Sequence, residues 1–156
     1  MKIQNGVSRL LFATVVLIPF ALSLVFGAKP AQARRYINLP SRPVIAPFSN
    51  GVLVGNTLYL AGTIGFDPQT GRPPAQIEDE VHHALDNLKE VLAQAGMTMD
   101  DLVSVTVFCP DLSLYDSFNT IYKTYFKKDP PARAFVGSGQ LLRGGHFEVM
   151  GVAVKQ

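Results

Sequence analysis

The sequence predicts an α+β fold, a mixed sheet of about four to six strands that carries two helices on one face. Two segments place apolar residues at helical spacing, and the remaining apolar runs are short enough to be strands. These elements follow the order ββ-α-β-α-ββ, without repeats or low-complexity tracts. Apolar side chains point both ways from the strands, so we expect other subunits to cover the sheet face opposite the helices.

The N-terminal segment, residues 1–33, has the pattern of a secretory signal peptide. Lys2 and Arg9 precede a long apolar run, and the segment contains no acidic residue. Ala31 and Ala33 have the small-x-small spacing that a signal peptidase requires. We therefore expect a bacterial signal peptide that is cleaved near Ala33, and a periplasmic location for the rest of the chain.

The apolar run over residues 10–27 has an alternative interpretation as a retained membrane anchor. Its length approaches the ~20 residues that a spanning helix needs. Pro19 interrupts the run, and Thr14 and Ser23 dilute it, which favours cleavage. In either case one domain, residues 34–156, is expected outside the cytoplasm, with membrane contact only if the segment is uncleaved.

The charge of this domain argues against nucleic acid as a partner. The chain has 14 basic and 12 acidic residues, and three basic residues but no acidic ones lie before residue 34. The domain therefore has 11 basic and 12 acidic residues and a net charge of −1. A near-neutral domain without a basic run has no electrostatic attraction for nucleic acid.

The single cysteine, Cys109, excludes an intrachain disulfide. A domain of this size without such a bond relies on its apolar core, on a partner subunit, or on both. Cys109 follows an apolar run and has no evident base nearby in the sequence. We expect it to be a small buried side chain rather than a nucleophile.

The first elements are a hairpin and a turn. Residues 34–50 contain three prolines and are predicted to be an irregular lead-in. Two strands follow over residues 52–54 and 57–60, joined by the turn formers Gly55 and Asn56. A second turn is predicted over residues 67–71, where proline presets one backbone angle and glycine accepts a positive φ.

The clearest helix is predicted over residues 77–95, and Gly96 supplies its end. Its apolar positions are Ile77, Val81, Ala84, Leu85, Leu88, Val91, Leu92 and Ala95. Residues 103–108 then alternate between valine and other residues, which predicts a strand with one face against the core.

The second helix is predicted to begin near Ser113 and Asp116, which have the spacing of a capping box. Its apolar face carries Leu114, Phe118, Ile121 and Tyr125, and Pro130 and Pro131 are expected to end it. Two final strands are predicted over residues 132–136 and 147–154, with a turn at residues 143–145 between them.

Several kinds of catalytic motif are missing from the sequence. It contains no Gly-rich phosphate loop, no Cys or His pair at metal-binding spacing and no Gly-x-Ser-x-Gly motif. His82 and His83 are adjacent on a helix and point about 100° apart, so they cannot chelate one metal, and we expect both at the surface. His146 is expected to face solvent, although an exposed histidine there could line a cleft between subunits.

Two charged residues stand in otherwise apolar strands. Arg133 enters the strand at residues 132–136, where rigid backbone can present its planar fork to a carboxylate. Glu148 lies between apolar residues and can orient a water or transfer protons if it is partly desolvated. The alternatives are a surface salt bridge for Arg133 and a structural partner of a nearby arginine for Glu148.

Two further residues have mainly structural interpretations. Asn119 lies near the start of the second helix, where it is expected at the helix surface or bonded to backbone. Phe48 precedes the hairpin and is expected in the core or in the wall of a pocket.

The segments described above, taken in order, resemble the RidA/YjgF family over nearly all of residues 36–156. Each segment is a weak signal by itself, but the ordered set with its spacings is specific. The matching segments are 46–51, 55–59, 61–64, 67–71, 84–88, 105–108, 118–122, 131–133 and 147–149. The resemblance implies a chorismate-mutase-like α+β fold, a homotrimer with sites in clefts between subunits, and no metal or organic cofactor.

The resemblance also implies an activity and a set of site residues. The activity is hydrolysis of reactive 2-imino or enamino acids to 2-keto acids and ammonia. The family arginine falls on Arg133 and would clamp the substrate carboxylate, and the family glutamate falls on Glu148 and would position and activate water. Main-chain groups near Gly62 and Phe135 would line the pocket, and Asn119 would have a supporting role.

The sequence departs from the family pattern around this site. Phe48 stands where many active members carry a tyrosine, and Ala61 and Thr63 replace a common serine and a common glutamine. Leu142 and Met150 replace a usual proline and a second glutamate. The carboxylate clamp is retained with fewer polar contacts around it, which predicts a changed substrate preference or a reduced activity.

The sequence also allows functions other than imine hydrolysis. The main one is a family member that binds small carboxylates or keto acids without turnover, which the missing hydroxyls at Phe48 and Ala61 favour. A ribonuclease is disfavoured by the charge of the domain, and a chaperone-like or purely structural role is the remaining possibility. The expected partners are a small imino or keto acid and further copies of this chain.

Overall fold

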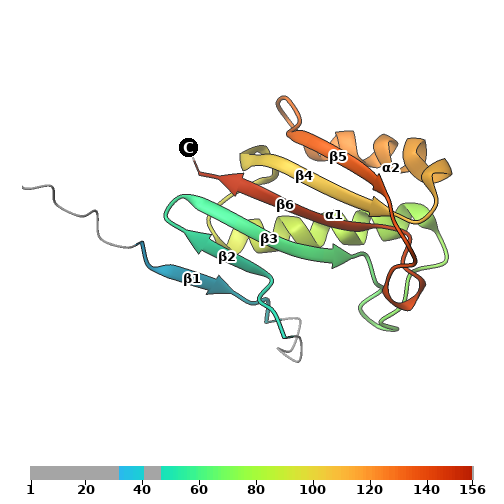
Figure 1. The fold of residues 1–156 in the computed structure, drawn as a ribbon, viewed down its shortest axis with the longest axis horizontal. Helices are drawn as coiled ribbons and strands as arrows, with labels where there is room; N and C mark the ends of the chain where they lie inside the picture. Colours follow the sequence, from blue (N-terminus) through green and yellow to red (C-terminus); the bar gives the residue numbers. More distant parts are fainter. Residues whose placement is uncertain (1–31, 41–46, 156) are drawn as a thin grey trace, which may run out of the picture. The chain divides into compact units, whose positions relative to one another are not determined.

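The computed structural model of the chain describes residues 32–40 and 47–155 (Figure 1). Nearly all of the predicted signal peptide therefore falls outside the described residues. Neither helix among these residues is long and apolar enough to cross a membrane.

Six strands form one mixed sheet in the order β1-β2-β3-β6-β4-β5. All neighbouring strands are antiparallel except β4 and β5, which are parallel. The helices α1 and α2 lie behind the sheet in Figure 1, on the same face, as predicted. The elements are β1 (Arg34–Ile37), β2 (Gly51–Val54), β3 (Thr57–Ile64), α1 (Ile77–Gln94), β4 (Leu102–Cys109), α2 (Tyr115–Tyr122), β5 (Ala132–Gly137) and β6 (Glu148–Val154).

The core lies between the sheet and the two helices. Leu85, Leu88 and Leu92 of α1 are at most 1% exposed, so the predicted apolar stripe of this helix faces the sheet. Alternate residues of β3, β4 and β6 meet this stripe, as a strand with one buried face requires. Gly96 has a φ of 71° and allows the chain to leave the helix, as predicted.

The predicted lead-in contains a strand that the sequence pattern did not indicate. Residues Arg34–Ile37 form β1, which pairs antiparallel with β2. Only Ile37 of this strand is buried, so no alternation of apolar and polar residues marks it. β1 is an edge strand, stabilised by its hydrogen bonds to β2 rather than by burial. The observed order therefore has one more strand than the predicted ββ-α-β-α-ββ.

The second helix ends earlier than predicted. It begins with a 3-10 turn at Leu112–Leu114, where the side chain of Asp111 accepts a hydrogen bond from the N–H of Ser113. The predicted capping box at Ser113 is therefore wrong. The helix continues into a 3-10 turn at Lys123–Tyr125, well before the prolines that were expected to end it.

The turns follow the prediction more closely. Gly55 has a φ of 62° in the two-residue turn of the hairpin. In the second turn, the Asp67 carboxylate accepts hydrogen bonds from the N–H groups of Thr70 and Gln69, which lower the pKa of Asp67. β4 departs from the predicted strict alternation, because a bulge lies between Leu102 and Ser104 and turns Val103 outward.

Gly65 marks a close approach between the sheet and α1, and we expect Gly65→Ala to destabilise the fold by about 3 kcal/mol. A Cβ on Gly65 would overlap the carbonyl oxygen of Glu80, which is helix backbone and cannot move aside. Urea unfolding measures the effect. The matched control is Gly139→Ala, because nothing lies near a Cβ there. Equal unfolding midpoints for the two variants would contradict this packing.

Candidate functional site

Arg133 lies at the start of β5 and faces α2. It pairs with Val105 of β4, whose buried side chain points to the helix face of the sheet. The guanidinium carbon lies 4.5 Å from the ring centroid of Tyr122, a geometry of cation–π attraction. The rings of Tyr115, Phe118 and Phe135 surround it at 5.7–5.8 Å.

The polar contacts of Arg133 leave it with an unsatisfied charge. Its Nη2 donates a hydrogen bond of 2.6 Å to Oδ1 of Asn119, while Nη1 is buried without a partner. No carboxylate pairs with Arg133 in the described part of the chain. The alternative of a surface salt bridge is therefore wrong. Asn119 is half-exposed on the helix and bonds a side chain, not the backbone. A buried N–H without an acceptor is unfavourable, which favours binding of an anion there.

Tyr122 does not supply that anion. Its hydroxyl is also buried without a partner. Burial raises the pKa of Tyr122 to about 12, although the charge of Arg133 acts in the opposite direction. The phenol is therefore neutral at physiological pH, and the positive charge of Arg133 remains uncompensated.

Glu148 begins β6 and faces the other side of the sheet. Its neighbours Phe147 and Val149 are fully buried against the helices, so the side chain of Glu148 points to the open face. A bulge in β3 lies between Leu60 and Thr63, and a Cβ on Gly62 would overlap Oε1 of Glu148. Gly62 thus leaves the space in which this carboxylate lies.

Arg133 and Glu148 do not meet within one protomer, because the sheet lies between them. Arg133 is in register with Val105 on the helix face, whereas Glu148 is in register with Phe108 on the open face. The side chain of Glu148 has no ion pair or hydrogen bond within residues 32–40 and 47–155. The alternative of Glu148 as a structural partner of an arginine is therefore wrong for the protomer.

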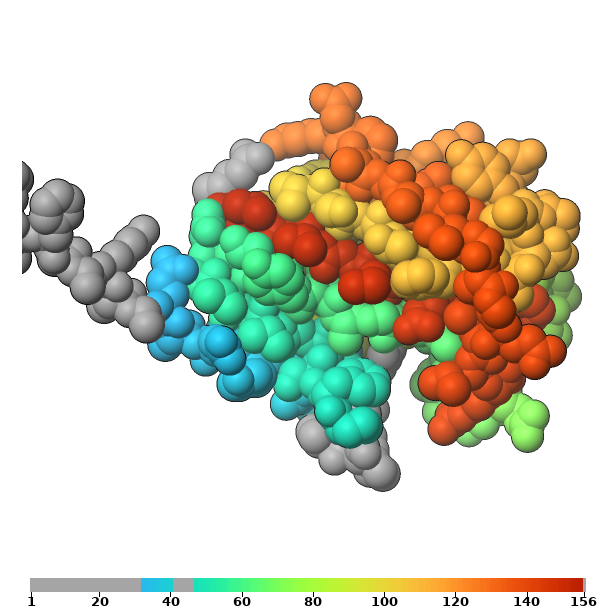
Figure 2. All heavy atoms as spheres, viewed as in Figure 1, coloured from blue at the N-terminus to red at the C-terminus, as the bar shows by residue number. Residues whose placement is uncertain are grey.

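The open face of the sheet is uncovered in the protomer. Figure 2 shows β3, β6, β4 and β5 at the surface of this face. Tyr59 is 53% exposed, Met150 39% and Val136 38%. Phe48, ahead of β2, is 54% exposed, so it does not belong to the core of the protomer.

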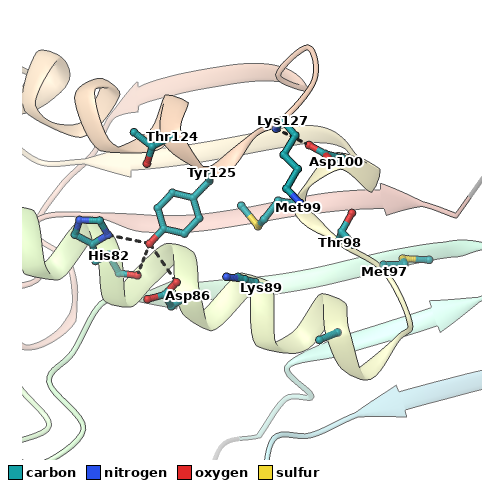
Figure 3. Close-up of a pocket in the computed structure, with 11 residues that line it drawn as sticks. His82, Asp86, Lys89, Met97, Thr98, Met99, Asp100, Thr124, Tyr125 and Lys127 are labelled. Atoms are coloured by element: carbon teal, nitrogen blue, oxygen red, sulfur yellow. Dashed lines mark hydrogen bonds between the residues drawn. The ribbon is translucent and has the colours of Figure 1, made fainter.

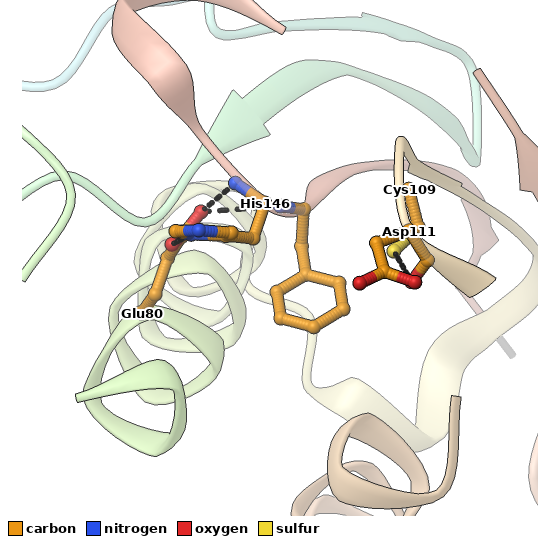
Figure 4. A network of polar contacts seen from close by, with 5 residues as sticks. Glu80, Cys109, Asp111 and His146 are labelled. Atoms are coloured by element: carbon orange, nitrogen blue, oxygen red, sulfur yellow. Dashed lines mark hydrogen bonds and ion pairs between the residues drawn. The ribbon is translucent and has the colours of Figure 1, made fainter. Parts of the chain in front are cut away.

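The structure joins two residues that the sequence did not connect, Glu80 and His146 (Figure 4). Glu80 of α1 is fully buried, and its carboxylate contacts the Nδ1 of His146 at 2.6 Å. The side chain of His146 was expected to face solvent. It is 42% exposed, and its Nδ1 is bonded to Glu80. A sequence signal did exist, because Glu80 falls on the apolar stripe of α1.

The remaining candidate side chains have structural roles. Cys109 is buried, donates a hydrogen bond to the carbonyl of Asp111, and has a pKa raised by burial, as expected of a structural cysteine. His82 is exposed as predicted and lies 2.9 Å from the hydroxyl of Tyr125, whereas His83 is half-buried. No group of three His, Cys, Asp or Glu side chains able to hold a metal occurs among the described residues.

A pocket of about 590 Å³ lies between α1 and the 3-10 turn at Lys123–Tyr125, with His82 and Tyr125 in its lining (Figure 3). It is lined by none of the predicted site residues. Two carboxylates and two ammonium groups share its rim, and no buried unpaired polar atom points into it. The pocket therefore shows no preference for one class of ligand. Its charged residues are Asp86, Lys89, Asp100 and Lys127.

The fold and the site define an α+β protein with an arginine that has no acidic partner among the described residues. Residues 39–155 match the family model described as Endoribonuclease L-PSP. A 2-iminobutanoate/2-iminopropanoate deaminase of Mus musculus is 37% identical over 124 residues, which cover 78% of this chain and 92% of that protein.

Two solved structures from E. coli show the same fold. The YjgF gene product is 31% identical with a TM-score of 0.73, over 78% of this chain and 99% of that chain. TdcF with bound serine is 30% identical with a TM-score of 0.72, over 78% of this chain and 100% of that chain. This chain belongs to the RidA/YjgF family, and its deaminase relatives are hydrolases.

Proposed function

We propose that this protein hydrolyses 2-imino acids, and their enamine tautomers, to 2-keto acids and ammonia. The observation that carries the proposal is the guanidinium of Arg133, whose buried Nη1 has no hydrogen-bond partner and which pairs with no acid among the described residues. The deaminase relatives support it, and the serine bound to TdcF is a ligand that also has a carboxylate and a nitrogen on its α-carbon.

The proposed site is completed by a second protomer. One chain carries Arg133 and Glu148 on opposite faces of its sheet, so one substrate can reach both only where protomers meet. The uncovered apolar face offers the surface for that contact. A homotrimer, as the resemblance implies, would create such clefts.

Mixing two inactive variants tests this arrangement. Arg133→Ala and Glu148→Gln chains, refolded together, are expected to regain activity, because random mixing leaves about a quarter of the sites with both residues intact. Light scattering on the same samples gives the number of protomers. A monomer, or mixtures as inactive as the parent variants, would contradict a shared site.

In the proposed mechanism, Arg133 binds the substrate carboxylate through its planar fork, and Asn119 holds the fork by accepting from Nη2. Glu148 of a neighbouring protomer accepts a proton from water as the water oxygen bonds to the carbon of the protonated imine, which gives a neutral carbinolamine. Glu148 then returns this proton to the amino group, ammonia leaves as the C–N bond breaks, and the C–OH proton passes to the Glu148 carboxylate to leave the keto group. Main-chain groups near Gly62 and Phe135 line this cleft.

The chemistry makes small demands on the protein. A protonated imine is already electrophilic, so fixing its carboxylate beside an oriented water mainly supplies proximity. The carboxylate of Glu148 adds general acid–base catalysis, a contribution of about 10²–10⁴ in rate.

A binding protein without turnover is the second candidate. Phe48 and Ala61 lack the hydroxyl groups that many active relatives carry, and the exposed ring of Phe48 supplies no polar contact. Purified protein given freshly generated 2-iminopropanoate separates the two functions. We expect ammonia release above the rate in buffer. Binding of pyruvate without such acceleration would favour the second candidate.

We also propose that the domain acts outside the cytoplasm, in the periplasm. The support is the sequence pattern of residues 1–33, with its basic start, apolar run and small residues before Arg34. Amino-acid oxidases or dehydrogenases in that compartment could supply the imines. The mass of the chain in a periplasmic extract tests this, since a mass that includes residues 1–33 would indicate a retained segment.

A further inference from the structure

We propose that Glu80 is a positioning residue, which sets the place of Glu148 by holding the backbone where β6 begins. This inference rests on the proposed function, because it assigns Glu80 a role in presenting the water-activating carboxylate. Glu80 itself lies on the helix side of the sheet, and it acts through residues 146 and 147.

Three hydrogen bonds join the Glu80 carboxylate to this segment (Figure 4). Its Oε1 accepts from the N–H of His146 at 2.7 Å and from the N–H of Phe147 at 3.1 Å. Its Oε2 contacts Nδ1 of His146 at 2.6 Å. The residue that follows directly along the chain is Glu148, so these bonds constrain the position of its Cα.

Because Glu80 is buried, its carboxylate requires these hydrogen bonds. Its side chain is fully buried, and a buried carboxylate is stable only when hydrogen-bond donors surround it. The donors here are two backbone N–H groups and one imidazole, which must therefore keep their positions. The backbone of residues 146 and 147 is thereby tied to α1.

The same turn of α1 also contacts the strand on the other side of Glu148. The carbonyl oxygen of Glu80 abuts Gly65, which directly follows β3. The last residue of β3, Ile64, is paired with Glu148. Glu80 thus contacts the chain neighbour of each residue in this strand pair. Its side chain bonds the residue before Glu148, and its backbone oxygen abuts the residue after Ile64.

The chain that leads into β6 needs such an anchor. Arg143 has a φ of 54° and Gly144 a φ of 79°, so two successive residues adopt the left-handed conformation. This conformation is unfavourable for a residue with a side chain and persists only where surrounding contacts impose it. The bonds to Glu80 begin two residues after Gly144.

The first test compares Glu80→Leu with Glu80→Gln. Leucine is expected to lower kcat roughly 10- to 100-fold, because Glu148 loses its alignment with substrate, while KM changes by about twofold or less. Glutamine is expected to keep kcat within about threefold of the original, because its oxygen can still accept from both N–H groups and its amide can donate to His146. A glutamine variant as impaired as the leucine variant would overturn the proposal.

The second test asks whether Glu80 acts through Glu148. In a Glu148→Gln background, Glu80→Leu is expected to cause no further loss of kcat, since the group it positions is already gone. An equal loss in both backgrounds would mean that Glu80 has a general structural role, and would overturn the proposal. Asp101→Ala is the matched control, because Asp101 also accepts two hydrogen bonds, from Thr98, and lies next to the far end of β6 from Glu148.

A third measurement does not depend on turnover. In a crystal structure of Glu80→Leu, the carboxylate of Glu148 is expected to leave its place beside Gly62, and in Glu80→Gln it is expected to stay. An unmoved Glu148 in the leucine variant would overturn the positioning role. If the original protein releases no ammonia, the proposed enzymatic function fails, and this structural comparison still decides the role of Glu80.

Discussion

Arg133→Ala is expected to lower kcat/KM by about 10³-fold or more, because the substrate loses a bidentate, charge-assisted contact with its carboxylate. Binding of pyruvate, measured by calorimetry, is expected to be lost together with turnover. Arg133 makes no salt bridge in the described part of the chain, so its removal breaks one hydrogen bond, to Asn119, and its ring contacts. The protein is therefore expected to fold and assemble as before.

Arg133→Lys separates charge from shape at the same position. Lysine keeps the positive charge but loses the planar fork and the stacking on Tyr122, so we expect weak binding and little turnover. Size-exclusion chromatography confirms assembly for both variants. Turnover that survives in Arg133→Ala, in an intact oligomer, would place the carboxylate site elsewhere in the molecule.

Glu148→Gln is expected to lower kcat by about 10²–10⁴, the usual contribution of general acid–base catalysis, with little change in KM. Glutamine fills the space beside Gly62 but cannot accept the proton of the attacking water. Binding of pyruvate is expected to persist, because Arg133 is untouched. Steady-state kinetics on freshly generated imine measure both parameters.

Glu78→Gln is the matched control for this substitution. Glu78 is an exposed carboxylate in the first turn of α1, so the same chemical change there is expected to leave kcat unaltered. A Glu148→Gln variant with undiminished kcat would show that another group activates the water. The half-exposed His146, two residues earlier, would then be the next group to test.

Much of the fold could be predicted because local patterns determine it. The apolar stripe of α1, the turn at Gly55 and the final strands follow from periodicity and turn chemistry that neighbouring residues impose. β1 could not be predicted, because its stability comes from pairing with β2 and only one of its side chains is buried. After the second helix, the N–H of Lys127 donates a hydrogen bond to the carboxylate of Asp100, a partner 27 residues away in the sequence.

The candidate site, like the fold, could be predicted from the sequence only in part. The sequence by itself determined which residues carry usable chemistry, since an arginine and a glutamate in apolar strands differ from their neighbours in type. Only the tertiary structure decided their surroundings. Arg133 lies among aromatic rings and pairs with no acid of the described residues, Glu148 lies on the opposite face of the sheet, and Glu80 is bonded to His146. The physical reason is that residue type depends on one position, whereas burial, partners and sheet face depend on how distant segments pack together.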